Sequence, residues 1–493
     1  MHEQLARAEK GVRELLQTRE DRWYPKFHIA AQAGWINDPN GLSHFNGRYQ
    51  TYFQHHPYGT QWGPMHWGHV SSEDLVTWRR EPIALAPSVD ADRDGVFSGS
   101  AVVSDDGKLI VYYTGHRWRN GIDEEQGNLQ VQCMAVSEDG VTFEKKGVIV
   151  ECPDGLLHFR DPKVWREAET WYMIFGACSA ANRGEVWLYT SIDMVKWDFD
   201  RVLFQDPNPE AFMLECPDMF PLGADRYVLV YCPMGPSPDG YQARNMHNAG
   251  YVVGRWTPGE DFEQLTAYRP IDWGHNYYAP QTFQAPDGRR IMFAWMGSFT
   301  TAVPTQEDGW CGQLTVPREL TLGEDNRLRA LPIAEFTELR ENEIDFGAFE
   351  LAANHDLTVL GDADAAEILL DVDLAATTSE RVGLHVHATP TGRSTVVAYD
   401  DLSRRVTIDR SNSGHGDRGY RSAPHNGDRL KLRVLIDRGS VEVFVGDGVE
   451  ALTSFAFPET GSRAIRLSSE AGTVAVNSLK AYRLGTIWEE ADR

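Results

Sequence analysis

The chain repeats one layout five times between residues 41 and 297, and this repeat limits the folds it can adopt. Each copy contains an apolar run, a polar turn and a second run rich in aromatic residues. Turns such as Asn46-Gly47 and Asp106-Gly107 suit β-hairpins. Repeats of this size that are made of short strands predict a β-propeller, in which blades surround a central axis. The copies start about 60 residues apart, at Gly41, Ala101, Pro162, Asp218 and Gln281.

A second recurring segment supports the propeller. The segment from Ser72 to Trp78 is echoed at residues 137–143 and 191–197, where a serine, an aspartate and a final aromatic residue keep their positions. Each copy closes a strand-rich unit with a turn and an aromatic side chain. The alternative is a long β-sandwich in which the similarity is accidental, and the two markers together favour five blades.

Three of the repeats carry an acid just before a proline, in Asp38-Pro39, Asp161-Pro162 and Glu215-Cys216-Pro217. Proline fixes its own φ and keeps the preceding residue out of the helical region, so each acid is expected on a stiff bend. Equivalent positions of propeller blades face the same axis. We therefore expect the three acids to converge on one funnel.

The charge balance excludes several partner classes. The 493 residues contain 72 acids and 47 Lys plus Arg, for a formal net charge of -25. Such acidity argues against nucleic acid or an anionic membrane as a partner. No apolar run is long enough to span a bilayer. A charged sugar phosphate would need a local basic patch against this background.

The N-terminal residues predict a helix rather than a secretory signal. Charges occur throughout residues 1–20, and no continuous apolar core is present. Helical spacing of apolar residues predicts a short amphipathic helix within residues 1–21. None of the six cysteines forms a Cys-x-x-Cys pair, so we expect reduced thiols and a cytoplasmic protein. Cys216 is expected to be an inert packing residue rather than a nucleophile.

The pattern changes after the fifth repeat. Leu430, Leu432, Val434 and Ile436 alternate with polar residues, which is typical of half-buried antiparallel strands. We predict an all-β chain with a five-bladed β-propeller over residues 22–330, a charged linker over 331–345 and a C-terminal β-sandwich over 346–493.

These segments resemble glycoside hydrolase family 32, the β-fructofuranosidases that include invertases and sucrose-6-phosphate hydrolases. The resemblance covers nearly the whole chain and implies the same five-bladed propeller and β-sandwich. Ile36 departs from the family, in which methionine is common at this position. The matching segments are Trp35 to Gly41, Tyr52 to Gln54, Trp67 to His69, Phe97 to Ser100, Arg160 to Pro162, Glu215 to Pro217, Tyr278 to Phe283 and Asp437 to Phe444.

The resemblance also implies a role for each acid. It places Asp38 as the nucleophile, Glu215 as the general acid/base and Asp161 as a stabiliser of the transition state, as a retaining glycosidase requires. Arg160 adjoins Asp161 in the sequence, so we expect it to hold that carboxyl ionised. Glu215 has no basic neighbour in the sequence, and a dry site should raise its pKa, as a proton donor requires.

Further residues at the matching positions are expected to hold the fructosyl ring. Polar groups suited to sugar hydroxyls and apolar groups suited to a wall of the pocket are Asn37, Gln54, Trp62, Phe97, Ser98 and Arg160. We expect neither a metal nor another cofactor, because no ligand pattern is complete.

Three functions remain compatible with the sequence. The first is hydrolysis of terminal β-fructofuranosides, with sucrose, sucrose 6-phosphate or short fructans as the small-molecule substrate. The second is fructosyl transfer to a sugar through the same intermediate. The third is a catalytically silent sugar-binding propeller, which the presence of all three acids disfavours. The residues 116–120 suit either a sugar subsite or a phosphate clamp. An oligomer is also compatible with the sequence.

Overall fold

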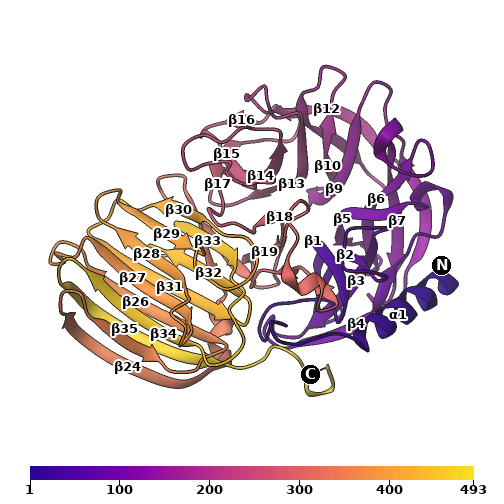
Figure 1. The fold of residues 1–493 in the computed structure, drawn as a ribbon. Helices are drawn as coiled ribbons and strands as arrows, with labels where there is room; N and C mark the ends of the chain where they lie inside the picture. Colours follow the sequence, from indigo (N-terminus) through magenta and orange to yellow (C-terminus); the bar gives the residue numbers. More distant parts are fainter. Residues whose placement is uncertain (493) are drawn as a thin grey trace.

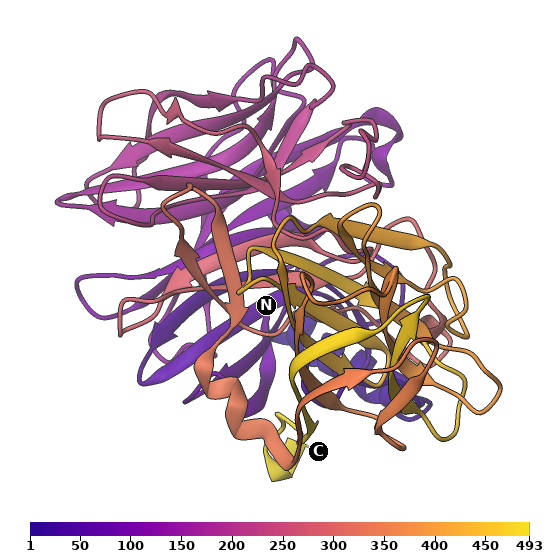
Figure 2. The same ribbon diagram turned by 90° about the vertical axis from the view of Figure 1, so that its left-hand side faces the viewer.

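The computed structural model describes residues 1–492 and contains two β domains that lie side by side (Figures 1 and 2). The first is a propeller of five antiparallel blades and the second is a sandwich of two six-stranded sheets. The predicted all-β architecture is therefore confirmed. Helix α1 (His2–Leu16) lies on the outside of the propeller (Figure 1). Its Ala8 and Val12 pack against Ile83 in the outermost strand of the first blade. No described helix is long and apolar enough to cross a membrane.

Each blade has four main strands, named here from the axis outward. The blades are β1 (Gly34–Phe45), β2 (Arg48–His56), β3 (His66–Ser72) and β4 (Trp78–Leu85); β5 (Gly95–Val103), β6 (Leu109–Trp118), β7 (Asn128–Ser137) and β8 (Glu144–Val150); β9 (His158–Glu167), β10 (Thr170–Cys178), β11 (Gly184–Ser191) and β12 (Asp198–Gln205); β13 (Met213–Pro221), β14 (Tyr227–Met234), β15 (Gly250–Arg255) and β16 (Glu263–Gln264); and β18 (Tyr278–Gln284), β19 (Arg290–Met296), β22 (Arg318–Leu322) and β23 (Leu328–Pro332).

Short elements complete and connect the blades. Strand β17 (Arg269–Pro270) pairs with β15, and β21 (Gln313–Leu314) pairs with β19. Strand β20 (Trp310–Cys311) follows the fifth blade's β19 in the chain yet pairs in parallel with β1 of the first blade, so it fastens the ring. The short 3₁₀ helices are η1 (Asp90–Asp92), η2 (Glu124–Gln126), η3 (Pro304–Gln306), η4 (Ala334–Leu339) and η5 (Glu490–Asp492).

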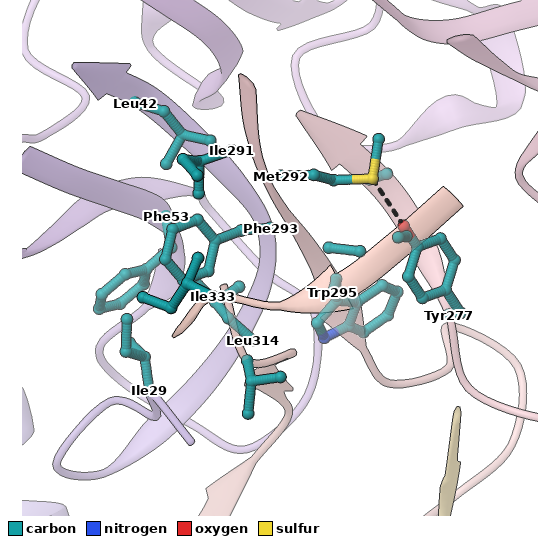
Figure 3. Packing of buried hydrophobic residues seen from close by; sticks show 14 of the residues in the cluster. Ile29, Leu42, Phe53, Tyr277, Ile291, Met292, Phe293, Trp295, Leu314 and Ile333 are labelled. Atoms are coloured by element: carbon teal, nitrogen blue, oxygen red, sulfur yellow. Dashed lines mark hydrogen bonds between the residues drawn. The ribbon is translucent and has the colours of Figure 1, made fainter. Parts of the chain in front are cut away.

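The innermost strands form a closed ring. Strand β1 contacts β5, β5 contacts β9, β9 contacts β13, β13 contacts β18, and β18 returns to β1. Figure 3 shows the apolar packing that joins the last blade to the first, with Leu42 and Phe53 close to Ile291 and Phe293. Side chains on neighbouring blades thus hold the inner strands at fixed positions around one axis.

The recurring Ser-x-Asp segment forms the same turn in three blades, between the third and fourth strands. In the first blade, the Ser72 hydroxyl accepts from the Leu75 amide at 2.8 Å, and the Asp74 carboxylate accepts from the Thr77 amide at 2.7 Å. Corresponding bonds occur at Ser137 and Ser191. These side chains replace backbone partners that the turn leaves unpaired.

The sandwich consists of two antiparallel sheets with a shared apolar core. Their strand orders are β24 (Arg340–Leu351), β35 (Val474–Leu484), β26 (Ala366–Asp373), β31 (Arg429–Asp437), β32 (Ser440–Val445) and β33 (Glu450–Phe455); and β25 (Asp356–Leu360), β34 (Ala464–Glu470), β27 (Arg381–Ala388), β28 (Thr395–Asp400), β29 (Arg405–Asp409) and β30 (Tyr420–Pro424). The segment 331–345 holds the end of β23, the helix η4 and the start of β24.

A buried charged cluster joins the two domains. His28 lies between two sandwich carboxylates, with Nδ1 2.8 Å from Asp437 Oδ2 and Nε2 2.9 Å from Glu442 Oε1. Arg318 of the propeller also binds Glu442, and it binds Asp272. The five side chains involved in these bonds, counting both domains, are fully enclosed. The cluster fixes the sandwich against the propeller, because each buried charge needs its partner.

Candidate active site

The five innermost strands share one irregularity at equivalent positions. Pairing with the second strand of each blade shifts register there, which marks a β-bulge. A bulge leaves a residue out of the ladder and redirects its side chain. The residues at the bulge are Asp38, Ser98, Asp161, Cys216 and Ala279, and the residues before them are Asn37, Phe97, Arg160, Glu215 and Tyr278.

Proline and backbone strain keep these bulges in place. A proline follows the bulge residue in four blades, where its missing N–H removes a ladder bond. Three bulge residues adopt the left-handed conformation although none is glycine, with φ of 68° at Asp161, 48° at Cys216 and 49° at Ala279. Such strain persists only where the surrounding structure holds it, and it is common at functional sites.

The structure brings all nine predicted site residues into one cavity of about 1010 Å³. Asp38, Asp161 and Glu215 come from β1, β9 and β13, and the six predicted binding residues line the same space. His116 and Trp118 of the segment 116–120, which the sequence analysis connects with a sugar subsite or a phosphate clamp, also line it. The sequence analysis gives no site role to other lining residues, including Gln130, His158, Met234, His247 and Phe299.

The carboxyl group of Asp38 is held by three donors. Ser98 Oγ donates to Oδ2 at 2.5 Å and Asn37 Nδ2 donates to Oδ1 at 3.0 Å. The Cys216 thiol donates to Oδ2 at 3.4 Å. Burial raises the pKa of Asp38, and the hydrogen bonds from Ser98 and Asn37 oppose this rise. Both oxygens are thus oriented by neighbours on β1, β5 and β13.

Glu215 has strong partners that the sequence did not indicate. Arg160 donates from Nε at 3.1 Å and from Nη2 at 2.7 Å to Oε1, and the Tyr278 hydroxyl donates to Oε2. Burial raises the pKa of Glu215, but the charge of Arg160 and these hydrogen bonds outweigh burial and lower it. The expectation of a raised pKa for Glu215 was therefore wrong for the free site, because a cation from the next inner strand reaches this carboxyl.

The pKa of Asp161 also differs from the expectation, which was an ionised carboxylate held by Arg160. Arg160 Nε lies 4.0 Å from Asp161 Oδ2, farther than from Glu215. Burial raises the pKa of Asp161 to about 7, with Arg160 opposing and the charges of Glu215 and Asp38 adding to the rise. We expected from the sequence that Arg160 would hold this carboxyl ionised, and that expectation was wrong for the free site. In the free site the proton therefore favours Asp161 over Glu215.

Cys216 is buried, as expected, but it is more than a packing residue. Its amide donates to Asp161 Oδ2 at 2.9 Å, and its thiol lies 3.6 Å from the same oxygen and 3.4 Å from Asp38 Oδ2. Burial raises the pKa of the thiol well above its usual range, with the charges of Asp161 and Asp38 adding to the rise. A neutral thiol therefore lies between two carboxyl groups, and its single proton can be donated to either of them.

The predicted binding residues form a polar floor and an aromatic wall. Gln54 Nε2 donates to the Val96 carbonyl at 3.0 Å, which fixes its amide. Phe97 stacks on His116 with ring centroids 4.1 Å apart. Trp62 is 40% exposed and stands edge-on to Phe97 at the opening. Such a mixture of fixed polar groups and an apolar wall is typical of pockets for small ligands.

Tyr278 is the clearest residue that sequence reasoning missed. The sequence analysis names it only within a matching segment and gives it no role. The repeat itself contains the missing signal, because Tyr278 occupies the position of Asn37, Arg160 and Glu215 in its own blade.

Within residues 1–492 no group of three or more His, Cys, Asp or Glu residues could hold a metal ion.

Comparisons with known proteins show which family the chain matches. Residues 28–332 match the family described as "Glycosyl hydrolases family 32 N-terminal domain", and residues 335–483 match "Glycosyl hydrolases family 32 C terminal". The chain is 41% identical to a sucrose-6-phosphate hydrolase of Escherichia coli over 97% of this chain and 98% of that protein. It is 40% identical to a raffinose invertase of Escherichia coli over 99% of both.

Solved structures of the same family have the same fold. A Bombyx mori β-fructofuranosidase variant in complex with sucrose has a TM-score of 0.85 and 30% identity, with 98% of each chain covered. A sucrose-6-phosphate hydrolase from Lactobacillus gasseri has a TM-score of 0.86 and 25% identity, with 97% of each chain covered.

Proposed function

The chain belongs to glycosyl hydrolase family 32 and is a glycoside hydrolase of the β-fructofuranosidase type, and we propose that it cleaves sucrose or sucrose 6-phosphate with retention of configuration. One observation carries the proposal: the buried carboxyl groups of Asp38 and Asp161 and the half-buried one of Glu215 meet in one cavity. They come from three inner strands of a closed ring, and Arg160 joins them from the strand that carries Asp161. The relatives named as sucrose-6-phosphate hydrolase and raffinose invertase, and the relative solved with sucrose, support this substrate class.

In the first step, Asp38 attacks the anomeric carbon of the fructosyl unit. A bond forms between a carboxylate oxygen of Asp38 and that carbon, while the bond from the carbon to the glycosidic oxygen breaks. Glu215 gives its proton to the departing oxygen, so the leaving sugar departs as a neutral alcohol. The donors Ser98 and Asn37 keep the Asp38 carboxylate oriented for attack.

In the second step, water replaces the leaving sugar. Glu215 accepts a proton from water as its oxygen attacks the anomeric carbon, and the ester bond to Asp38 breaks. Fructose is released, Asp38 regains its carboxylate and Glu215 regains its proton. Two inversions at one carbon give net retention.

For this cycle to start, Glu215 must be protonated and Asp161 ionised. Hydroxyl groups of a bound fructosyl unit that donate to Asp161 would stabilise its ionised form and lower its pKa. Because the charges of Asp161 and Glu215 repel, ionised Asp161 favours the protonated form of Glu215. Ionised Asp161 would then stabilise the positive charge that develops on the sugar ring.

Sucrose turnover by the purified protein tests the proposal. We expect glucose and fructose in equal amounts over the whole time course. An excess of free glucose over free fructose, with trisaccharides at high sucrose, would instead assign fructosyl transfer. Binding of sucrose without cleavage of either sucrose or sucrose 6-phosphate would identify the protein as a silent sugar-binding propeller and contradict the proposal.

A further inference from the structure

The cavity carries an unusual charge balance for a site that would accept a sugar phosphate. Five of the residues that line it are acids: Asp38, Asp123, Glu124, Asp161 and Glu215. Among the described residues that line it, Arg160 is the only lysine or arginine. That guanidinium is already used, because it binds Glu215 and lies 2.9 Å from His158 Nδ1. Among these lining residues, no lysine or arginine without a bound partner faces the place where the sugar would bind.

The histidines of the cavity add no positive charge near neutral pH. Burial, followed by the nearby charge of Arg160, lowers the pKa of His116 to about 3 and that of His158 to about 4. Burial also lowers the pKa of His247. All three imidazoles are thus neutral at pH 7 and can only exchange hydrogen bonds with a ligand.

The segment 116–120 was compatible with a phosphate clamp, but its strand geometry turns its first arginine away. Side chains alternate along β6, so His116 and Trp118 face the cavity while Arg117 faces the other side. Arg117 Nη1 binds Asp90 Oδ2 at 2.8 Å there. Arg119 lies past the end of the strand, and its exposed side chain runs beside Gly127, which lines the cavity, although Arg119 itself does not. Neither arginine lines the cavity.

The groups that do face the entrance suit an uncharged ring. Trp62 and Trp118 stand with ring centroids 6.3 Å apart, and Ile122 and Leu157 add apolar surface. Aromatic faces pack against the apolar faces of neutral sugars. A phosphate monoester carries a charge of about -1.5 to -2 at pH 7. It would be repelled by Asp123 and Glu124, the two acids at the rim of the cavity. The net charge of -25 adds to this repulsion.

We propose that the site accepts fructosides whose leaving group is uncharged, sucrose in the first place, and discriminates against sucrose 6-phosphate. The inference rests on the proposed function and narrows its substrate. The rim acids Asp123 and Glu124 and the absence of a free cation at the described cavity residues set the discrimination.

Parallel kinetics with sucrose and sucrose 6-phosphate test the inference. We expect kcat/KM for sucrose to exceed that for the phosphate by about tenfold or more at low salt. Raising the ionic strength from about 0.01 M to about 1 M should raise kcat/KM for the phosphate and leave sucrose nearly unchanged, since salt screens the repulsion. Equal or better use of the phosphate would overturn the inference while leaving the proposed hydrolase function intact. Failure to cleave either substrate would overturn both.

Rim variants locate the source of the discrimination. Glu124 lines the cavity and Glu125 does not, so E124Q and E125Q form a matched pair. We expect E124Q to narrow the ratio of the two kcat/KM values severalfold and E125Q to leave it unchanged. The variant R119Q tests whether Arg119 contributes to binding of the phosphate. A tenfold or larger loss confined to sucrose 6-phosphate in R119Q would show that Arg119 reaches the phosphate, and the inference would fall.

Discussion

Arg160 donates two hydrogen bonds to Oε1 of Glu215, although the two residues lie on neighbouring blades and 55 positions apart in the chain. The bonds measure 3.1 Å from Nε and 2.7 Å from Nη2. Two hydrogen bonds from a cation stabilise the ionised form of this carboxyl group and so lower its pKa. The residue assigned as proton donor is thus ionised in the free site, and substrate must change its protonation before the bond can break.

The Tyr278 hydroxyl contributes to this ionised state, so its removal should shift the pH profile. Tyr278→Phe deletes a donor to Glu215 and should raise the pKa of that carboxyl, because the lost hydrogen bond favours the ionised form. The protonated form that the first step needs then persists to higher pH. We expect the basic limb of the pH profile of kcat/KM to move to higher pH.

Tyr277 provides the control for this shift. It is the preceding residue and is also buried, but its hydroxyl lies 3.0 Å from Met292 Sδ, away from the acids (Figure 3). Tyr277→Phe should leave the basic limb in place. An unmoved limb in Tyr278→Phe would show that this hydroxyl does not control the acid.

Local signals were enough to predict the architecture and to select the three acids. Proline chemistry predicts a stiff bend at each Asp-Pro and Glu-Cys-Pro segment, and the structure shows a bulge of the inner strand at each of them. The partner of Arg160 could not be read in the same way. Arg160 adjoins Asp161 in the sequence, yet its guanidinium lies 2.7 Å from Glu215 and 4.0 Å from Asp161. Which carboxyl receives the guanidinium depends on how two blades pack, and no local pattern encodes that.

Asp38→Asn should abolish turnover without unfolding the protein. An amide cannot form the fructosyl ester, while it keeps the size of the side chain and can still accept from Asn37 or Ser98. We expect a loss on the order of 10⁴-fold or more in kcat. Circular dichroism should match the parent. A folded variant with about a tenth of the parent activity would exclude Asp38 as the nucleophile.

The charged cluster between the domains should make stability depend on pH. The carboxylates of Asp437 and Glu442 outweigh the burial of His28 and raise its pKa to about 9, against about 6.5 in the unfolded chain. The folded state therefore binds a proton more tightly. The resulting stabilisation is complete below about pH 6.5 and is lost as pH rises through about 9, with a size of roughly 3 kcal/mol.

His28→Gln removes this contribution, and the difference from the parent isolates it. We expect the gap in apparent Tm to be widest near pH 6 and to narrow toward pH 9, while other groups cancel because both proteins carry them. His355→Gln, at an exposed position of the sandwich, should show no such trend. A gap that stays constant with pH would mean that His28 is not charged in the folded protein.

A substrate with an activated leaving group should separate the roles of Glu215 and Asp161. Such a leaving group departs without a proton, so Glu215→Ala should retain much of the first step with it and lose most activity on sucrose. Asp161→Asn should instead slow both substrates to a similar extent, because both pass through the same positive charge on the sugar. If the activated substrate rescued Asp161→Asn and not Glu215→Ala, the two assignments would be exchanged.

The configuration of the first product tests the two-step mechanism as a whole. A retaining enzyme places its nucleophile and its acid about 5 to 5.5 Å apart, whereas an inverting enzyme needs a wider gap for water. We expect this spacing between the carboxyl groups of Asp38 and Glu215, and β-fructofuranose as the first product. Time-resolved NMR of fresh hydrolysate reads the anomer before mutarotation. Prompt appearance of the α-anomer would exclude an ester on Asp38 and, with it, the return of Glu215 as a base, since a single displacement by water inverts the carbon.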